Sequence, residues 1–261
     1  MFRPVIGIQL YTLRNHTKTA QDFDTTLARL EKMGVDTVQI SAIGDIPGEA
    51  QRDILRAHNM KCCVTHKSYD KINNNLDELI AEHKLIDCDA LGIGSAPDEF
   101  RGNKKNVLKF IEFADGVGRK LKENGMTFHY HNHNFEFYRL MDSKFCMMDF
   151  LINDTDPETF KFIPDLAWIH YAGADPVEML YKMKGRVKVV HFKDYIFEGN
   201  GDRRFVTLGN GYVDLEACYK ACIDLEIPYI MYEHDIDWPD DDPFKACEQS
   251  WDYLKNLEAK F

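Results

Sequence analysis

Three histidines, His129, His131 and His133, alternate within the stretch TFHYHNHNFEF that begins at Thr127. The stretch has the character of a β-strand, in which every second side chain points to the same face, so the three imidazoles share a face. Imidazole ligates metals and exchanges protons near neutral pH. The stretch is therefore either part of a metal or acid/base site or a polar loop rich in histidine, and the elements around it decide which.

Short segments of β character alternate with longer amphipathic segments along the whole chain. Strands are predicted at residues 5–13, 35–44, 60–66, 89–97, 126–133, 161–169, 187–194 and 228–235. Helices are predicted between and after them, at 19–34, 48–59, 73–88, 104–124, 143–153, 176–183, 214–227 and 243–257. Eight such units of about 33 residues are typical of a (β/α)8 barrel, and no linker divides them. The sequence therefore predicts an α/β protein with one TIM-barrel domain over residues 1–261.

The main alternative fold is a doubly wound open sheet. That fold normally binds its nucleotide on a glycine-rich turn after the first strand, and this chain has YTLRNHTK there. The barrel is therefore favoured.

Metal-ligating side chains gather at the predicted ends of strands five to eight, where a (β/α)8 barrel builds its active site. They are His131, Asp165, His191 and Glu233, one on each strand. Two imidazoles and two carboxylates would hold a divalent ion such as Mn²⁺, Co²⁺, Zn²⁺ or Mg²⁺. The pattern does not choose among these ions.

Six segments at or just after strand ends occur in a characteristic order: GIQLYTLR from Gly7, YHNHNFEF, DLAWIHYAGADP, VHFKD, LGNGYVD and YEHD. Together they resemble the xylose-isomerase-like, sugar phosphate isomerase/epimerase family, which also includes inosose dehydratases and endonuclease-IV-type enzymes. The resemblance covers essentially the whole chain. It implies that His131, Asp165, His191 and Glu233 hold the metal.

Two positions depart from that family. Many members have Glu in place of His131 and His in place of Trp168. In the family's epimerases two metal-bound glutamates exchange a proton across the substrate carbon, a role His131 cannot fill in the same way. The dehydratase branch has a histidine-rich fifth strand, which keeps that branch as an alternative.

The predicted activity is a divalent-metal-dependent isomerisation or epimerisation of a small sugar, keto-sugar or sugar phosphate. The ion would polarise a carbonyl, and a proton would move at the adjacent carbon, with Glu233 as base and His133 or Lys193 as acid. Loss of a β-hydroxyl or β-glycosyl group would instead make the protein a dehydratase or lyase of a keto-sugar or keto-inositol. A non-catalytic sugar-binding barrel is a further alternative, and a DNA repair endonuclease would need a three-metal cluster and basic loops.

Substrate contacts are predicted for Gln9, His66, Trp168 and Glu136. His66 would bind a hydroxyl group, Trp168 would offer an apolar platform for a sugar face, and Glu136 would orient an imidazole. The alternatives are a packing role for Trp168 and an unpartnered loop carboxylate for Glu136. His129 lies one layer deeper and is predicted to be an interior residue.

The charge balance is 32 basic against 43 acidic residues, a net charge of −11 without a long basic run, which argues against a nucleic-acid partner. No apolar run approaches the roughly 18 residues of a membrane span, and the first residues lack the pattern of a secretory signal. The seven cysteines form no CxxC pair and read as reduced thiols. A cytoplasmic protein that acts on a small carbohydrate, away from membranes, is expected, and the resemblance adds a possible homodimer.

Overall fold

Eight parallel strands form the centre of the molecule in the computed structural model, which describes residues 2–261. Their order in the sheet is β6-β5-β4-β3-β2-β1-β10-β7. Their bounds are β1 (Val5–Gln9), β2 (Thr37–Ser41), β3 (Lys61–His66), β4 (Ala90–Ile93), β5 (Thr127–His131), β6 (Phe160–Ile163), β7 (Val189–Phe192) and β10 (Tyr229–Tyr232).

The two edges of this sheet meet between β6 and β7. Parallel bridges join Phe162 to Val187 and Asp165 to His191. The backbone N–H of His191 donates to the carbonyl of Pro164 at 2.8 Å. The sheet therefore closes on itself, and the predicted TIM barrel is confirmed.

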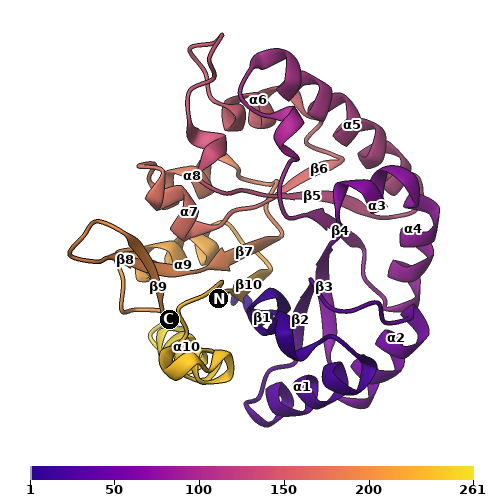
Figure 1. Cartoon of the computed structure of the whole chain (residues 1–261), viewed down its shortest axis with the longest axis vertical. Coiled ribbons are helices and arrows are strands. Elements are labelled where there is room, and N and C mark those ends of the chain that lie inside the picture. The colour runs from indigo at the N-terminus through magenta and orange to yellow at the C-terminus, as the bar shows by residue number, and fades with distance from the viewer. Residues whose placement is uncertain (1) are drawn as a thin grey trace.

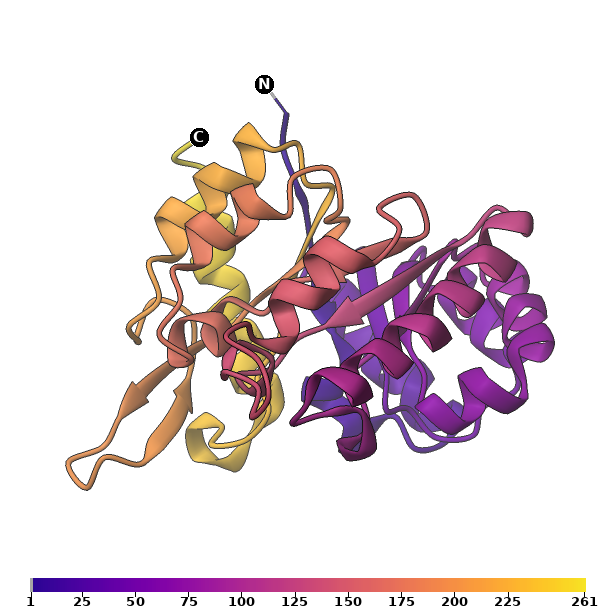
Figure 2. The same ribbon diagram turned by 90° about the horizontal axis from the view of Figure 1, so that it is seen from above.

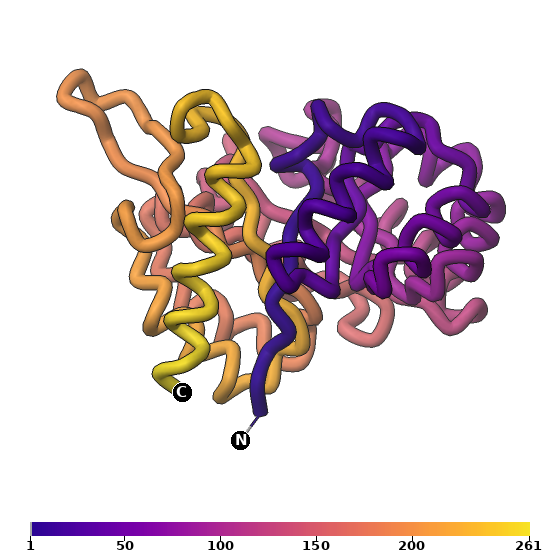
Figure 3. The backbone as a smooth tube through the Cα atoms, turned by 90° about the horizontal axis from the view of Figure 1, so that it is seen from below, coloured from indigo at the N-terminus to yellow at the C-terminus, as the bar shows by residue number. Residues whose placement is uncertain are grey.

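Helices surround the strands on the outside (Figure 1). They are α1 (Ala20–Lys32), α2 (Gly48–Ala57), α3 (Tyr69–Asn74), α4 (Leu76–Leu85), α5 (Lys104–Glu123), α6 (Met147–Asp154), α7 (Leu166–Tyr171), α8 (Pro176–Lys182), α9 (Leu215–Asp224) and α10 (Pro243–Glu258). Among residues 2–261, no helix is both long and apolar enough to cross a membrane. The chain ends lie near each other, with α10 running beside β1 (Figure 3).

Local sequence signals account for where these helices begin and end. Thr19 and Asp22 form a capping box at the start of α1, each side chain accepting from the other's backbone N–H. Gly34 follows that helix with φ of +85°, a conformation that glycine adopts without strain. Pro176 occupies the first turn of α8, where its missing N–H removes no hydrogen bond.

All eight strands are shorter than predicted, and two of them end because a helix begins. The first was predicted to reach Leu13 but ends at Gln9, because the Gln9 side chain accepts a hydrogen bond from the N–H of Tyr11. That contact starts a 3₁₀ segment, η1 (Leu10–His16). The sixth strand was predicted over residues 161–169 and ends at Ile163. Its second half is helix α7.

The predicted helices also differ in their bounds. The one expected from residue 73 begins as α4 at Leu76, because Asn75, with φ of −131°, separates it from the preceding helix α3. The one expected from residue 143 begins at Met147. Short 3₁₀ segments η2 (Asp98–Phe100), η3 (Phe135–Phe137) and η4 (Pro239–Asp241) lie in loops.

An antiparallel hairpin that the sequence did not predict follows β7. It consists of β8 (Asp194–Phe197) and β9 (Arg203–Val206) and projects from the barrel (Figure 2). The segment LGNGYVD wraps around its base: the N–H groups of Gly209, Gly211 and Val213 donate to the Asp194 carboxylate at 2.9–3.2 Å. These N–H groups therefore serve the fold and are not free to bind a ligand.

Candidate active site at the C-terminal end of the barrel

A cavity of about 300 Å³ opens at the C-terminal ends of the barrel strands. It is lined by Tyr11, Ser41, His66, Gly94, Ser95, His131, His133, Lys193, Glu233 and Asp235. Polar groups from seven different strand ends thus surround one space. This is the end at which (β/α)8 barrels carry out chemistry.

The four residues predicted as metal ligands come together beside this cavity. His131, Asp165, His191 and Glu233 are all buried, and each offers a ligand atom within 4.8 Å of the others. His131 Nε2 lies 3.4 Å from Asp165 Oδ2 and 3.7 Å from Glu233 Oε2. His191 Nδ1 lies 2.9 Å from Glu233 Oε2.

The backbone around Asp165 explains how its carboxylate is aimed. Pro164 cannot donate a ladder hydrogen bond, and Asp165 then becomes the N-cap of α7, its Oδ1 accepting from the N–H of Trp168 at 3.0 Å. The backbone N–H of Asp165 donates to the Asn132 side chain at 3.1 Å. One carboxylate oxygen is thus used by the fold, and the other, Oδ2, faces the cluster.

His131 is oriented by β4. Its Nδ1 donates to the carbonyl of Gly94 at 2.9 Å, so Nε2 is the nitrogen that faces Asp165 and Glu233. Burial alone would lower the pKa of His131, but these two carboxylates outweigh it and raise the pKa. A ligand imidazole held by a backbone carbonyl in this way has a fixed tautomer and a fixed ring plane.

The ammonium group of Lys193 sits among the carboxylates of the cluster. Its Nζ lies 3.0 Å from Asp165 Oδ2, 2.8 Å from Glu233 Oε2 and 3.1 Å from both oxygens of Asp235. Burial alone would lower the pKa of Lys193, but the three carboxylates outweigh it and raise the pKa. Burial alone would raise the pKa of Glu233 and of Asp165, but the charge of Lys193 outweighs it and lowers both.

The four candidate ligand residues fit a divalent cation. A buried cation already bridges Asp165 and Glu233, so the pocket is built for positive charge. His131 Nε2 and His191 Nδ1 both approach Glu233 Oε2 and complete a set that suits Mn²⁺, Co²⁺, Zn²⁺ or Mg²⁺. His131, Asp165, His191 and Glu233 would hold the ion, with the cavity open to a substrate.

The two remaining cavity imidazoles are kept neutral. Burial lowers the pKa of His66 well below its usual range, and the charges of His131 and His191 lower it further. Burial also lowers the pKa of His133 to about 3, with His131 and Lys193 acting in the same direction. Both rings therefore face the cavity as uncharged donors or acceptors of hydrogen bonds at neutral pH.

The other residues predicted to touch substrate are placed differently. Gln9 is fully buried, and its Oε1 accepts from Tyr11 at the start of η1. The Glu136 carboxylate is also fully buried: it accepts from the Tyr130 hydroxyl at 2.7 Å and from the His133 N–H at 2.8 Å. Neither side chain lines the cavity, so Glu136 supports the loop that carries His133.

Trp168 lies on α7 behind the cavity wall and not on a strand. Its ring centroid is 5.2 Å from that of His133, and the Arg203 guanidinium stacks 4.1 Å from it. The indole thus packs one side of His133. His129 is fully buried one layer below the cluster and pairs with the Thr127 hydroxyl at 2.8 Å, an interior position as expected.

Gln39 is a site residue that the sequence reading overlooked. It lies in the middle of β2 between apolar neighbours, and its amide contacts both His191 and His66. Only the register of the closed barrel places these three side chains together. A buried glutamine within an apolar strand was the available signal.

Comparison with known proteins places the chain in a family. A family model described as a xylose isomerase-like TIM barrel matches residues 27–257. The chain belongs to this family. An inosose dehydratase of Clostridium beijerinckii is 23% identical over 221 residues, which are 79% of this chain and 68% of the relative.

Solved structures of xylose isomerase-like barrels superpose over nearly the whole chain. A sugar phosphate isomerase/epimerase from Parabacteroides distasonis gives a TM-score of 0.81 at 20% identity and covers 98% of this chain and 97% of its own. A xylose isomerase-like barrel from Mycobacterium smegmatis in complex with magnesium gives 0.71 at 14% identity, covering 100% and 99%. At these identities the likeness shows the shared fold.

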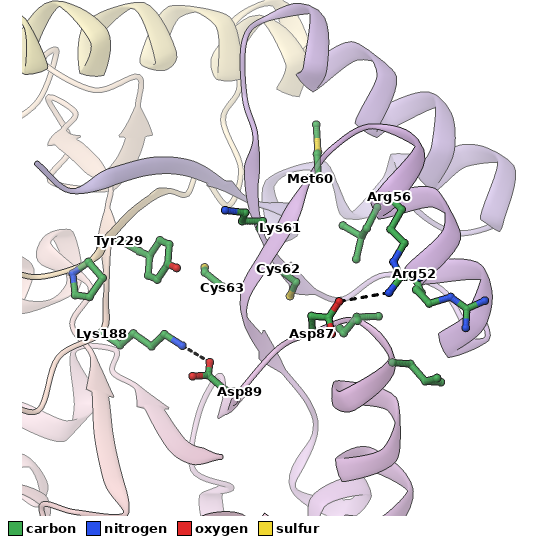
Figure 4. A pocket seen from close by; sticks show the side chains of 14 residues that line it. Arg52, Arg56, Met60, Lys61, Cys62, Cys63, Asp87, Asp89, Lys188 and Tyr229 are labelled. Carbon is green, nitrogen blue, oxygen red and sulfur yellow. Dashed lines mark hydrogen bonds and ion pairs between the residues drawn. The ribbon is translucent and has the colours of Figure 1, made fainter. Parts of the chain in front are cut away.

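A larger cavity, of about 580 Å³, lies at the opposite end of this xylose isomerase-like barrel, among the first residues of β3 and β10 (Figure 4). Its charged groups pair with each other: Lys188 with Asp89, and Arg56 with Asp87 at 3.5 Å. The end of the barrel that carries it is the one that stabilises the fold and does not hold the catalytic loops. By volume alone this cavity would be the candidate active site. The cavity of about 300 Å³ is the better candidate, because the four possible metal ligands and the neutral imidazoles lie there.

Proposed function

We propose that this protein is a divalent-metal-dependent enzyme that removes a proton next to the carbonyl of a small keto-sugar or keto-inositol and expels the β-oxygen substituent, as a dehydratase or lyase. The observation that carries the proposal is the buried His131, Asp165, His191 and Glu233 set beside a cavity lined by Lys193. When bound, the ion would polarise the substrate carbonyl as a Lewis acid and acidify the adjacent C–H.

Glu233 is the proposed base. Its contacts with Lys193, His191 and His131 all run through Oε2, which leaves Oε1 to accept the proton from carbon. Because the charge of Lys193 keeps the carboxylate ionised, the base is ready at neutral pH.

Lys193 is the proposed acid. As the C–H proton passes to Glu233, its electron pair forms the new C=C bond and the C–O bond to the β-substituent breaks. The Lys193 ammonium protonates the departing oxygen, so water or an alcohol leaves. Glu233 then loses its proton to solvent, and Lys193 regains one from solvent.

The lining of the cavity favours an uncharged, polyhydroxylated substrate. Within residues 2–261, Lys193 is the only lysine or arginine of the lining, and three carboxylates already pair with it. The remaining partners are hydroxyls and neutral imidazoles, from Ser41, Ser95, Tyr11, His66 and His133. These groups bind sugar hydroxyls and offer no free cation to a phosphate.

We rank elimination ahead of isomerisation, although isomerisation was the first prediction from the sequence. A two-base epimerase needs a second carboxylate opposite Glu233, and strand β5 supplies the imidazole of His131 there. The inosose dehydratase among the relatives supports the same order. Isomerisation or epimerisation remains the second candidate, because the neutral His133 ring faces the same cavity and is able to exchange a proton.

The test is incubation with Mn²⁺ in D₂O, with free ketoses, keto-inositols and 3-keto-glycosides as separate substrates, followed by NMR. An unsaturated product with release of water or alcohol supports elimination, whereas deuterium at carbon in an otherwise intact sugar supports epimerisation. The non-catalytic sugar-binding barrel is favoured if no substrate gives either product and the protein, purified without chelators, carries no stoichiometric metal.

A further inference from the structure

The side chain of Gln39 spans the interior of the barrel from β2. It is fully buried, and its Oε1 lies 2.8 Å from His191 Nε2 on β7. Its Nε2 lies 2.9 Å from His66 Nε2 on β3. One amide therefore connects a proposed metal ligand to an imidazole of the cavity wall.

The amide fixes the proton of His191. The amide oxygen of Gln39 only accepts hydrogen bonds, so His191 carries its proton on Nε2 and donates it. The other ring nitrogen, Nδ1, lies at hydrogen-bond distance, 2.9 Å, from Glu233 Oε2. A bound ion would take the place of the proton in that contact, and Nδ1 is the nitrogen that would ligate it.

The same amide fixes the proton of His66 in the opposite sense. The Gln39 –NH₂ group only donates, so His66 Nε2 accepts and the ring proton lies on Nδ1. A Cβ added at Gly94 would lie 3.3 Å from that Nδ1, so the glycine keeps this side of the ring open. His66 and Gly94 both line the cavity, and Nδ1–H is thereby presented to a substrate oxygen.

We propose that Gln39 is a positioning residue that sets the tautomers of His191 and His66 together, making His191 Nδ1 a metal ligand and His66 Nδ1–H a donor to a hydroxyl or carbonyl oxygen of the substrate. The inference rests on the proposed function for the roles of the metal and substrate. The tautomers themselves are a property of the protein alone.

Two substitutions distinguish the contact of Gln39 with His191 from its contact with His66. In Gln39→Glu the new carboxylate still accepts from His191 Nε2–H but cannot donate to His66, whose proton should move to Nε2. In Gln39→Leu neither contact remains. Because loss of a residue that orients a ligand imidazole costs 10–100-fold in metal affinity, we expect a rise of about that size in the Mn²⁺ Kd for Gln39→Leu. For Gln39→Glu we expect a Kd within about threefold of wild type, with a higher KM for the substrate.

Gln51 provides the matched control. It is a buried glutamine on α2 whose amide donates to the carbonyl of Ile46 at 2.7 Å, away from the imidazoles. Gln51→Leu should reduce thermal stability without changing the Mn²⁺ Kd or either tautomer.

The experiment combines histidine-selective ¹⁵N NMR on metal-free protein with Mn²⁺ titration by calorimetry. The inference is supported by wild-type His191 protonated on Nε2 and His66 on Nδ1, with only the His66 assignment reversed in Gln39→Glu. A wild-type His191 without a proton on Nε2, or a Gln39→Leu protein with unchanged Kd and tautomers, overturns it. The wild-type spectrum decides the tautomers even if Gln39→Leu fails to fold. A wild-type protein that shows these tautomers but binds no divalent ion would refute the proposed function and leave the assignment of the protons standing.

Discussion

Replacement of Lys193 by methionine tests whether the carboxylate cluster is built around a cation. In metal-free protein the substitution removes the one ammonium that contacts Asp165, Glu233 and Asp235 at 2.8–3.1 Å. Removing one partner of a buried ion pair costs about 3–5 kcal/mol, because the other charges stay buried without compensation. For a chain of this size each kcal/mol shifts Tm by about 2–4 °C, so a loss of roughly 6–20 °C is expected in EDTA.

Divalent metal should recover much of this loss. A ligand present at 100 times its Kd stabilises the folded state by about 2.7 kcal/mol, and the variant should bind the ion more tightly than wild type because no ammonium competes for the carboxylates. The Tm difference between the two proteins should therefore shrink when EDTA is replaced by saturating Mn²⁺. Differential scanning calorimetry of both proteins under both conditions measures it.

Lys188→Met is the control for loss of an ordinary lysine–carboxylate pair. Lys188 pairs with Asp89 at the opposite end of the barrel and is partly exposed (Figure 4). Its removal should cost no more than about 1 kcal/mol, equally with and without metal. The reasoning is refuted if Lys193→Met loses as little as Lys188→Met in EDTA, or if its deficit is the same in Mn²⁺ as in EDTA.

Three further outcomes are expected. Asp165→Asn retains the helix cap but removes a charged ligand, so calorimetry should show Mn²⁺ affinity lowered at least tenfold with little change in helix content; an unchanged Kd would contradict its place in the ligand set. His133→Gln should reduce kcat/KM by about 10²–10⁴ if the ring exchanges a proton in the reaction, while its Mn²⁺ Kd stays at the wild-type value. Burial raises the pKa of Glu136 from its usual 4.5 to about 7, so its contribution to stability is present below pH 4.5 and lost as pH rises through 7, a change of about 3 kcal/mol. Glu136→Gln should therefore gain stability relative to wild type at pH 8 and not at pH 4, as urea denaturation at both pH values would show.

The barrel and the clustering of the four candidate ligand residues were predictable because each depends on local patterns. Strand-forming runs recur with amphipathic helices between them, and closure of eight parallel strands brings consecutive strand ends to one rim. Residues at those ends, such as His131 and His191, are then neighbours whatever the exact bounds of each strand. Their proximity needed no knowledge of side-chain rotamers.

Contacts across the interior of the barrel were not predictable in the same way. Gln39 and His191 are 152 positions apart and lie on strands that do not pair with each other, so only the registers of the strands between them bring the two side chains together. The hairpin after β7 was missed for a different reason. Asp194 organises it by accepting from backbone N–H groups up to Val213, and a loop held by one carboxylate leaves no periodic pattern in the sequence.

The error at the sixth strand shows how closely the fold and the site depend on each other. The apolar run after Pro164 suits a strand or a helix equally, and the alternation of an extended strand was assumed. Had the strand continued, no helix would follow for Asp165 to cap. Because α7 begins directly after Asp165, one oxygen of Asp165 caps α7 and the other meets Lys193 and His131. Helix α7 in turn carries Trp168 against His133. The residue that would bind the metal is therefore also the one that begins the helix supporting the neighbouring imidazole. A change in the contact between Asp165 and its cation would act on α7, and through Trp168 on His133.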